Sequence, residues 1–264
     1  MPEGHTLHRL AREHHQRFGD HPLRVGSPQG RFADGAALLD GRVLAKAEAY
    51  GKHLFLDFAD DRWLHVHLGL YGKWAFGELP APAPQGQVRV RLEGNQSYAD
   101  LRGATVCEVI TSADKRAIEA RLGPDPLRRR TSGENAWRRL SASRSPVGLL
   151  LMNQEVVAGV GNVYRAEVLF RAGLSPFREG RAVPREVFDP LWHDLVTVMR
   201  AGLRVGRIIT TRPEHRPRAR DVAAEDAHYV YRRAGLPCRV CTQPVATEVL
   251  AGRNLFWCPT CQSS

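Results

Sequence analysis

Four cysteines near the C-terminal end place the tightest limit on how this chain can fold. They form two C-x2-C pairs, Cys238 with Cys241 and Cys258 with Cys261, separated by residues 242–257. This spacing suits a tetrahedral Zn²⁺ ion, and four thiolate ligands leave no position for a water molecule. The sequence therefore predicts one zinc ion with a structural role. A disulfide framework is the less favoured alternative.

The segment between the two cysteine pairs predicts a β-hairpin. Residues 245–250 and 254–257 have strand character, and Ala251-Gly252-Arg253 lies at the turn between them. Arg253 would therefore stand at the tip of the hairpin. Taken alone it could equally be a solvated turn residue, so its interpretation depends on whether the rest of the chain points to nucleic acid.

The charge balance points to a polyanionic partner. The 264 residues include 38 lysines and arginines against 28 acidic residues, which gives a formal net charge of +10. This excess favours nucleic acid, although a merely basic soluble protein is the alternative. The longest apolar run, residues 149–152, is far too short to cross a bilayer, and charged residues interrupt the N-terminal segment. We therefore expect an intracellular, cytoplasmic protein with no membrane partner.

The first half of the chain predicts helices around a β-sandwich or barrel. Residues 6–18 have the apolar spacing of a helix, and the glycine-rich residues 26–41 are expected to form a loop. Apolar and polar residues then alternate with period two in several short runs, which is typical of a sandwich or barrel. These runs are residues 42–49, 53–58, 63–67, 87–92, 96–101 and 105–110.

The second half is predicted to be helical. A helix capped by Ser112 ends at Gly123, and the proline- and arginine-rich residues that follow indicate a linker. Thr131 to Glu134 fits a capping box for the next helix. Two helices joined by the glycine-bearing turn at residues 157–162 form a unit like a helix-turn-helix. The further helices expected after the linker cover about residues 145–153, 163–173 and 184–203.

The chain opens with Met1-Pro2-Glu3-Gly4. Removal of Met1 would expose the secondary amine of Pro2, and an α-amino group titrates at about 8, so a useful fraction is nucleophilic near neutral pH. Glu3 places a carboxylate beside this amine, where an acid or base is needed. Met-Pro starts are common, so the pair gains meaning only from the remainder of the chain.

Three further segments each have a functional and a purely structural interpretation. Gly161-Asn162 precedes a helix and could bind a phosphate, or Asn162 could simply cap that helix. Lys52 lies between two predicted strands, where most lysines are only exposed turn residues. Leu70 and Tyr71 stand between glycines in a loop, where they could be buried or could form a wedge that enters a base stack.

Histidines are concentrated in the first half of the chain. His65 and His67 fall on one face of a predicted strand, which raises the question of a metal site. No carboxylate or cysteine accompanies them at a matching spacing, so a metal site is not favoured. Cys107 is interpreted as a small core residue.

The ordered set of Pro2-Glu3, Lys52, Gly161-Asn162 and a four-cysteine finger carrying Arg253 closely resembles the formamidopyrimidine-DNA glycosylase/endonuclease VIII family of base-excision repair enzymes. The resemblance covers nearly the whole chain. It implies an α+β fold, in which a β-sandwich flanked by helices is followed by a helical domain with a helix-two-turn-helix and a four-Cys zinc finger.

The resemblance also implies a division of the chain into parts. We expect an N-terminal catalytic β-sandwich domain at residues 1–123 and a linker at residues 124–133. A helical DNA-binding domain would follow at residues 134–230, and the zinc finger would occupy residues 231–264.

Within the family, the chain is more similar to the endonuclease VIII branch. Leu70-Tyr71 matches the pair found in endonuclease VIII loops, whereas the 8-oxoguanine branch carries an Arg-Phe wedge and here Arg102 is followed by Gly103. The family usually has Pro and Glu where this chain has His5-Thr6. That departure leaves the base pocket and the lesion range open.

The resemblance implies a monomeric bifunctional DNA glycosylase and abasic-site lyase. It would remove oxidised bases, chiefly pyrimidines, from damaged DNA and nick the strand by β,δ-elimination through a Schiff base on Pro2. As a bacterial cytoplasmic protein it would join the nucleoid when bound to DNA. The implied roles are proton handling by Glu3, phosphate neutralisation and proton transfer by Lys52 and Arg253, phosphate binding by Asn162, and filling of the flipped base's place by Leu70 and Tyr71.

Two alternatives stay open. One is an 8-oxoguanine or formamidopyrimidine-type glycosylase of the same fold. The other is a non-catalytic zinc-finger regulator, which would explain the charge and the finger but would leave Pro2-Glu3 and Lys52 without a role.

Overall fold

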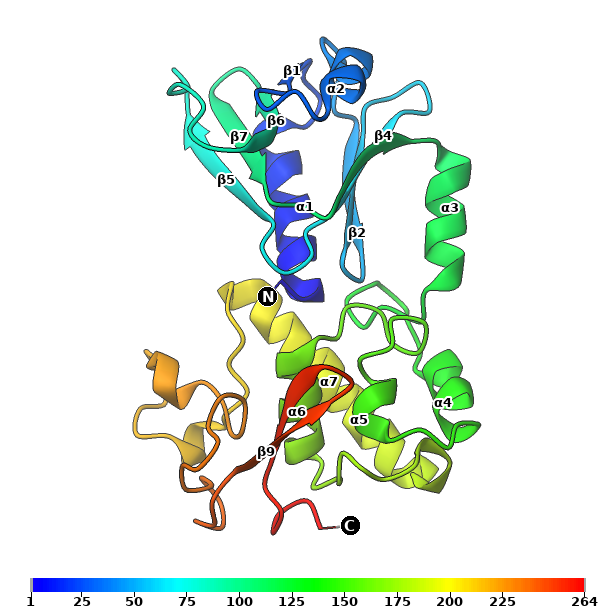
Figure 1. The fold of residues 1–264 in the computed structure, drawn as a ribbon, viewed down its shortest axis with the longest axis vertical. Coiled ribbons are helices and arrows are strands. Elements are labelled where there is room, and N and C mark those ends of the chain that lie inside the picture. Colours follow the sequence, from blue (N-terminus) through cyan, green and yellow to red (C-terminus); the bar gives the residue numbers. More distant parts are fainter. Residues whose placement is uncertain (1, 264) are drawn as a thin grey trace. The chain divides into compact units, whose positions relative to one another are not determined.

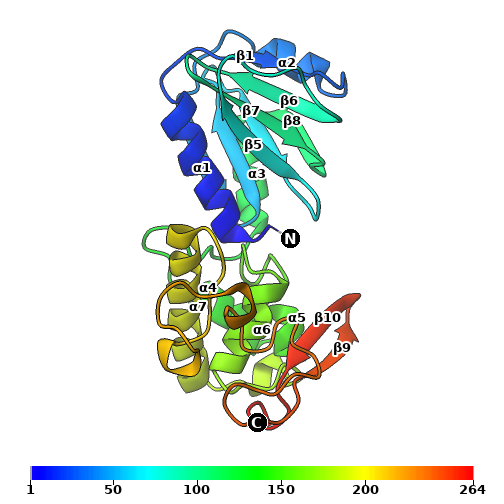
Figure 2. The ribbon, with the colours of Figure 1, turned by 90° about the vertical axis from the view of Figure 1, so that its left-hand side faces the viewer.

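The first unit of the computed structural model ends at Arg121 and is built around two four-stranded antiparallel sheets. The structure describes residues 2–263. The strand orders are β1-β6-β7-β5 and β2-β3-β4-β8, with helix α1 alongside (Figures 1 and 2). This arrangement confirms the predicted β-sandwich. The strands are β1 (Arg24–Gly26), β2 (Lys46–Tyr50), β3 (His53–Asp57), β4 (Trp63–His67), β5 (Lys73–Glu78), β6 (Val88–Glu93), β7 (Ser97–Arg102) and β8 (Val106–Ile110).

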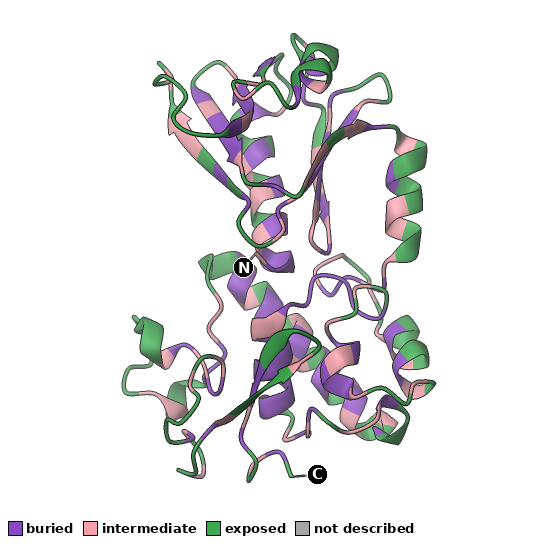
Figure 3. Ribbon diagram, in the orientation of Figure 1, coloured by how far each residue is buried: buried purple, intermediate pink, exposed green. Residues whose placement is uncertain are grey.

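The core of this unit lies between the sheets and α1 (Gly4–Phe18). Alternate residues such as Leu54 on β3 and Leu92 on β6 are fully buried in one apolar cluster. Helix α1 adds Leu7, Ala11 and Phe18 at helical spacing, and its buried residues alternate with exposed ones in Figure 3. Each fully buried leucine or phenylalanine contributes roughly 1.5–3 kcal/mol. Because this packing holds α1 against β2 and β3, the start of the chain has a fixed place beside those strands.

The expected loop at residues 26–41 is wrong in part, because it contains helix α2 (Ala33–Leu39). This helix has only seven residues and buries only Ala36 and Leu39. Two buried positions are too few to show a helical period in the sequence. Strands β1 and β5 also lie outside the predicted runs. Both are edge strands of their sheet, and an edge position asks less of the apolar pattern than a central one does.

The second unit begins at Leu122 and is mainly helical. Its core joins Tyr164 and Leu169 of α6 to Leu195 and Met199 of α7, all of them fully buried. Helix α7 ends at Gly206, whose φ of 82° is the left-handed conformation that glycine accepts at a helix end. The elements are α4 (Glu134–Ser141), α5 (Val147–Leu150), α6 (Asn162–Arg171), α7 (Arg185–Val205), three 3-10 turns at Gly180–Ala182, Pro213–His215 and Ala224–Asp226, and the hairpin β9 (Ala246–Leu250) with β10 (Arg253–Trp257).

Two predicted helix starts differ from the structure. Helix α3 (Ser112–Arg121) is capped by Thr111, whose hydroxyl accepts the Asp114 N–H at 3.2 Å while the Asp114 carboxylate accepts the Thr111 N–H at 3.0 Å. The capping box at residues 131–134 is wrong, because Gly133 is the N-cap of α4 and no side chain caps this helix. A capping motif in the sequence therefore does not fix the position of the cap by itself. Among the described residues, none of the helices combines the length and apolar character needed to cross a bilayer.

Candidate functional site

The start of the chain lies at the N-terminal end of α1. Pro2 is half-buried, and Glu3 is 0% exposed and forms the N-cap, with its carbonyl oxygen accepting the Thr6 N–H at 2.8 Å. The positive end of a helix dipole stabilises a carboxylate at this position. His5 is also buried, and burial, assisted by the charges of Arg9 and His8, lowers its pKa to about 4. Met1 lies outside the described residues.

Lys52 lies in the two-residue turn that joins β2 to β3. Tyr50 pairs with His53 across the turn, and Gly51 has a φ of 56°, which favours glycine. The structure therefore confirms that Lys52 belongs to a hairpin. Since α1 packs against both β2 and β3, this hairpin and the start of the chain are built on the same three elements.

Leu70 and Tyr71 lie in the loop between β4 and β5 and are 50% and 85% exposed. The alternative that they pack in the core is therefore wrong. The loop depends on its glycines, because Gly69 has a φ of 65° and a Cβ on Gly72 would stand 2.3 Å from the Leu68 carbonyl oxygen. An exposed aromatic beside an exposed leucine is available to contact a partner.

Asn162 is the first residue of α6, and its side chain reaches the zinc-finger hairpin. Its Nδ2 donates to the Asn254 carbonyl at 2.9 Å, one residue beyond Arg253. Asn162 is not the helix cap, since Gly161 holds that position. Buried Arg165 donates to the Asn162 side-chain oxygen and to the Asn254 carbonyl. Arg165 was not predicted from the sequence, although its position three residues after Asn162 on one helix face was a usable signal.

Arg253 begins β10 and pairs with Leu250, so it stands at the end of the hairpin as predicted. The turn residues Ala251 and Gly252 have φ values of 48° and 72°, the pattern of a two-residue hairpin turn with both φ positive. Through Asn254, the structure brings Asn162 beside the arginine-bearing end of the hairpin.

The four predicted cysteines come together at the base of this hairpin. Their Sγ atoms all lie within 4.8 Å of one another, with Cys238 to Cys261 at 3.9 Å and Cys241 to Cys258 at 3.4 Å. Four sulfurs at about 2.3 Å from one zinc ion would be about 3.8 Å apart, so the cysteines fit zinc. Among residues 2–263, no other group of three or more His, Cys, Asp or Glu side chains has such an arrangement.

A buried carboxylate anchors the segment that leads into the finger. Glu167 on α6 is fully buried and accepts the backbone N–H groups of Tyr229, Val230 and Tyr231 at 2.8–2.9 Å. The Thr210 hydroxyl also donates to it. One side chain therefore joins three parts of the second unit that are distant in sequence.

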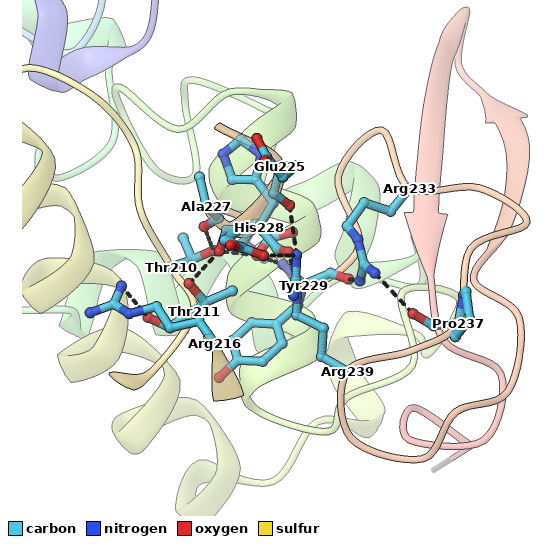
Figure 4. Close-up of polar contacts among 12 residues, drawn as sticks. Thr210, Thr211, Arg216, Glu225, Ala227, His228, Tyr229, Arg233, Pro237 and Arg239 are labelled. Carbon is cyan, nitrogen blue, oxygen red and sulfur yellow. Dashed lines mark hydrogen bonds and ion pairs between the residues drawn. The ribbon is translucent and has the colours of Figure 1, made fainter. Parts of the chain in front are cut away.

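Several arginines of this segment are used internally (Figure 4). Arg233 donates to the carbonyls of Tyr229 and Pro237 at 2.7 and 3.0 Å. Arg239 donates to the carbonyls of His228 and Glu225 at 3.1 and 2.6 Å. These hydrogen bonds stabilise the segment that leads into the zinc finger. Part of the positive charge of the chain therefore serves the fold and is not offered to a partner at the surface.

Three family models match the chain. They are the formamidopyrimidine-DNA glycosylase N-terminal domain over residues 1–107, the formamidopyrimidine-DNA glycosylase H2TH domain over residues 122–214, and the zinc finger found in FPG and IleRS over residues 235–263. The four cysteines of the structure lie inside the third match, which supports zinc as their ligand.

Curated relatives agree with these matches. Endonuclease 8 1 of Mycobacterium tuberculosis (strain H37Rv) is 53% identical over 279 residues, covering 100% of both chains. The formamidopyrimidine-DNA glycosylase of Thermus thermophilus is 35% identical over 230 residues, covering 86% of this chain and 85% of the relative.

Solved structures share the fold. The MutM (Fpg) protein of Thermus thermophilus superposes with a TM-score of 0.80 at 30% identity over 99% of each chain. Lactococcus lactis Fpg in complex with DNA containing N7-benzyl-Fapy-dG gives a TM-score of 0.84 at 21% identity over 100% of each chain. With a relative as similar as 53% along its whole length, the chain belongs to the formamidopyrimidine-DNA glycosylase/endonuclease VIII family of base-excision repair glycosylases.

Proposed function

We propose that this protein removes oxidised bases, chiefly pyrimidines, from DNA and then cuts the strand at the resulting abasic site. The observation that carries the proposal is the pairing of Pro2 with a completely buried Glu3 at the start of a helix locked into the core. A nucleophilic amine and a carboxylate held side by side supply what glycosidic cleavage through a covalent intermediate needs.

The first step is attack on the sugar. A base inside a duplex must be flipped out at a cost of a few kcal/mol, and Leu70 and Tyr71, both exposed on one loop, would fill the space it leaves. The uncharged Pro2 amine attacks C1′, and Glu3 handles the protons that let the base leave and the sugar ring open. The product is an iminium ion joining Pro2 to C1′.

The second step is elimination. The iminium withdraws electrons and acidifies C2′, so a proton leaves C2′ and the C3′–O bond breaks to release the 3′ phosphate. A δ-elimination then releases the 5′ phosphate. Lys52 and Arg253 neutralise phosphates and assist proton transfer, and Asn162 holds a phosphate near the lesion. The hydrogen bond from Asn162 to the backbone beside Arg253 supports a joint phosphate site.

The zinc finger would hold one structural Zn²⁺ through Cys238, Cys241, Cys258 and Cys261. The ion would fix the base of the β9–β10 hairpin and take no part in bond breaking, since four thiolates fill a tetrahedral site. Bond breaking would take place at residues of the first unit, and the β9–β10 hairpin would bind the DNA.

The preference for pyrimidine lesions is supported by the loop chemistry. Leu70 and Tyr71 are exposed, whereas Arg102, at the place of the arginine in the other branch's wedge, donates to Asp100 at 2.9 Å and to the Gln85 carbonyl at 3.1 Å. An arginine tied to its own sheet in this way is poorly placed to enter a base stack.

Borohydride trapping tests the nucleophile. With abasic-site duplex DNA, the protein should give a covalent adduct, and Pro2→Gly should weaken or abolish it because the secondary amine is lost. Pro84→Gly, in the exposed insert, is the matched control and should trap normally. An undiminished Pro2→Gly adduct, or full lyase activity in protein whose N-terminus is blocked by a tag or by retained Met1, would refute the amine assignment.

A panel of lesion-bearing oligonucleotides tests the substrate. Oxidised pyrimidines should be excised faster than 8-oxoguanine under single-turnover conditions. The reverse order would favour the 8-oxoguanine-type alternative. If the protein cleaved no lesion and no abasic site, both the glycosylase and the lyase function would be wrong.

A further inference from the structure

A chain of hydrogen-bonded side chains crosses the outer face of the β2-β3-β4-β8 sheet. His53 pairs with His67, Phe55 with His65, and His65 with Glu108, which places all of these side chains on the same face. The opposite face carries Leu54, Leu64 and other residues of the sandwich core. The polar chain is therefore separate from the apolar interior.

The contacts in this chain are short and continuous. His53 Nδ1 lies 2.9 Å from His65 Nε2, and His65 Nδ1 lies 2.9 Å from the Glu108 carboxylate. The ring centroid of His65 lies 5.1 Å from that of His53 and 4.9 Å from that of Phe55. His65 is only 3% exposed, whereas the Glu108 side chain is 51% exposed. This row of hydrogen-bonded side chains therefore extends from solvent at Glu108 to the hairpin that carries Lys52.

The hydrogen bonds determine which ring nitrogens carry protons. A carboxylate only accepts, so His65 must donate from Nδ1, and a neutral His65 then has a lone pair on Nε2. His53 must donate its Nδ1 proton to that lone pair. The Nε2 atom of a neutral His53 is therefore an acceptor, and it is the ring nitrogen that the contact with His65 leaves open toward other partners.

The surroundings keep both rings neutral. Burial, followed by the charges of His65, His67, Arg121 and Lys52, lowers the pKa of His53 to about 3. Burial also lowers the pKa of His65, against the opposing effect of Glu108. The titratable and charged groups around the two rings are Lys52 in the β2–β3 turn, His67 on β4, Glu108 on β8, and Arg121 at the end of α3.

We propose that Glu108 and His65 lock His53 in the tautomer whose Nε2 is an acceptor, and that this acceptor, one residue from Lys52 in the hairpin, orients the Lys52 ammonium for strand cleavage. The inference rests on the proposed function, which gives Lys52 its role. Glu108, His65 and His53 act through Lys52, so they are positioning residues. With the other tautomer, an N–H of His53 would face the ammonium and repel it.

Glu108→Gln separates this role from simple packing. A glutamine has nearly the same shape, but its amide can either accept from His65 Nδ1 or donate to it, so the tautomer is no longer fixed. We expect strand cleavage of abasic DNA to slow by about tenfold, because Lys52 loses its orientation, with little change in DNA affinity. Glu78→Gln, an exposed carboxylate at the end of β5, is the matched control and should cleave at the normal rate.

Nitrogen-15 NMR of histidine-labelled protein reads the tautomers directly, with His53→Gln and His65→Phe variants to assign the signals. At pH 7 both His53 and His65 should carry the proton on Nδ1, and Glu108→Gln should move His53 toward the Nε2 form. An Nε2–H tautomer of His53 in the unaltered protein would overturn the proposal.

The outcomes distinguish this inference from the proposed function. If the unaltered protein fails to cut abasic DNA, the proposed function is wrong and the positioning role falls with it. If the unaltered protein cuts normally and Glu108→Gln cuts equally fast, only the positioning role is wrong.

Discussion

Ionisable groups are buried in both units of this protein, and the buried histidines of the first unit contrast with a buried carboxylate of the second. In the first unit they include the imidazoles of His5, His14, His53 and His65, each with a pKa lowered by burial. The second unit buries charged groups that are held by many partners, as the first unit does with its ion pair of Arg91 and Asp100. Glu167, for example, accepts three backbone N–H groups and one hydroxyl.

The two kinds of buried group differ in what they can do. A neutral imidazole offers one hydrogen-bond donor and one acceptor, which suits the proton handling proposed for the first unit. A buried charge with every hydrogen bond satisfied costs several kcal/mol to disturb, which makes the surrounding backbone rigid. Arg171 illustrates the second case. Burial opposes its charge, but paired hydrogen bonds with Asp194 at 2.5–2.6 Å raise its pKa above the ordinary value.

Removal of zinc should produce the largest effect, and it should fall on the second unit alone. Binding of zinc contributes roughly 10 kcal/mol to the folding of isolated zinc fingers, so Cys258→Ser or a strong chelator should unfold the β9–β10 hairpin. DNA affinity should fall by more than tenfold, as measured by fluorescence anisotropy. Cys107→Ser, on β8 of the first unit, is the matched control. If Cys258→Ser retained its zinc content and its DNA affinity, the metal site would be wrong.

Glu167→Gln should be the next most damaging change. The amide would leave a donor facing backbone donors, and breaking such a buried charged network costs about 3–5 kcal/mol. Urea unfolding of the variant should show this loss, while Glu225→Gln, an exposed carboxylate near the same segment, should unfold as the unaltered protein does. Equal stability of the two variants would show that Glu167 does not hold this segment together.

Much of the fold and of the candidate site could be predicted from the sequence. Strong local signals were sufficient for the four-cysteine site, for the hairpins bearing Lys52 and Arg253, and for α1 and α7. Each depends on residues close together in sequence or on a long apolar period. By contrast α2 buries only two residues and the edge strand β5 buries only Trp74, so neither shows a clear apolar period.

What the sequence could not reveal are contacts between distant residues. His65 and Glu108 are 43 positions apart and meet only because β4 pairs with β8, so a carboxylate does accompany His65 although none lies at a matching spacing in the sequence. Glu167 and Tyr231 are 64 positions apart, and nothing in either segment indicates the other. Such pairs follow from the register of strands and the packing of loops, which a single sequence does not determine.

Acid should weaken the first unit through His14. This ring is fully buried against Trp74 and Phe76, and burial lowers its pKa from 6.5 to about 4 despite the hydrogen bond to the Leu10 carbonyl. The unfolded chain therefore binds more protons below pH 6.5, so stability is lost as pH falls from 6.5 toward 4. By linkage this loss is about 2 kcal/mol at pH 5. His14→Phe should make this dependence shallower in urea unfolding between pH 7 and 5, with His5 and His53 supplying part of the remainder, whereas exposed His193→Phe should leave it unchanged; equal slopes for the two variants would place the acid sensitivity elsewhere.

The finest test of the contrast compares two arginines of the second unit. Arg253 stands at the exposed tip of the hairpin, whereas Arg233 donates to two carbonyls beside the zinc finger. If Arg253 contacts a phosphate, Arg253→Ala should weaken DNA binding severalfold and lower the slope of log affinity against log salt by about one, because one fewer counterion is released. Its urea unfolding should not change.

Arg233→Ala should behave in the reverse way. Two backbone carbonyls lose their donor, so the stability of the second unit should fall by roughly 1–3 kcal/mol while the salt slope stays the same. If instead Arg253→Ala left the salt slope unchanged and Arg233→Ala lowered it, the phosphate contact would belong to the base of the finger and not to its tip. The division between arginines that hold the fold and arginines that hold the DNA would then have to be drawn at a different place in the same unit.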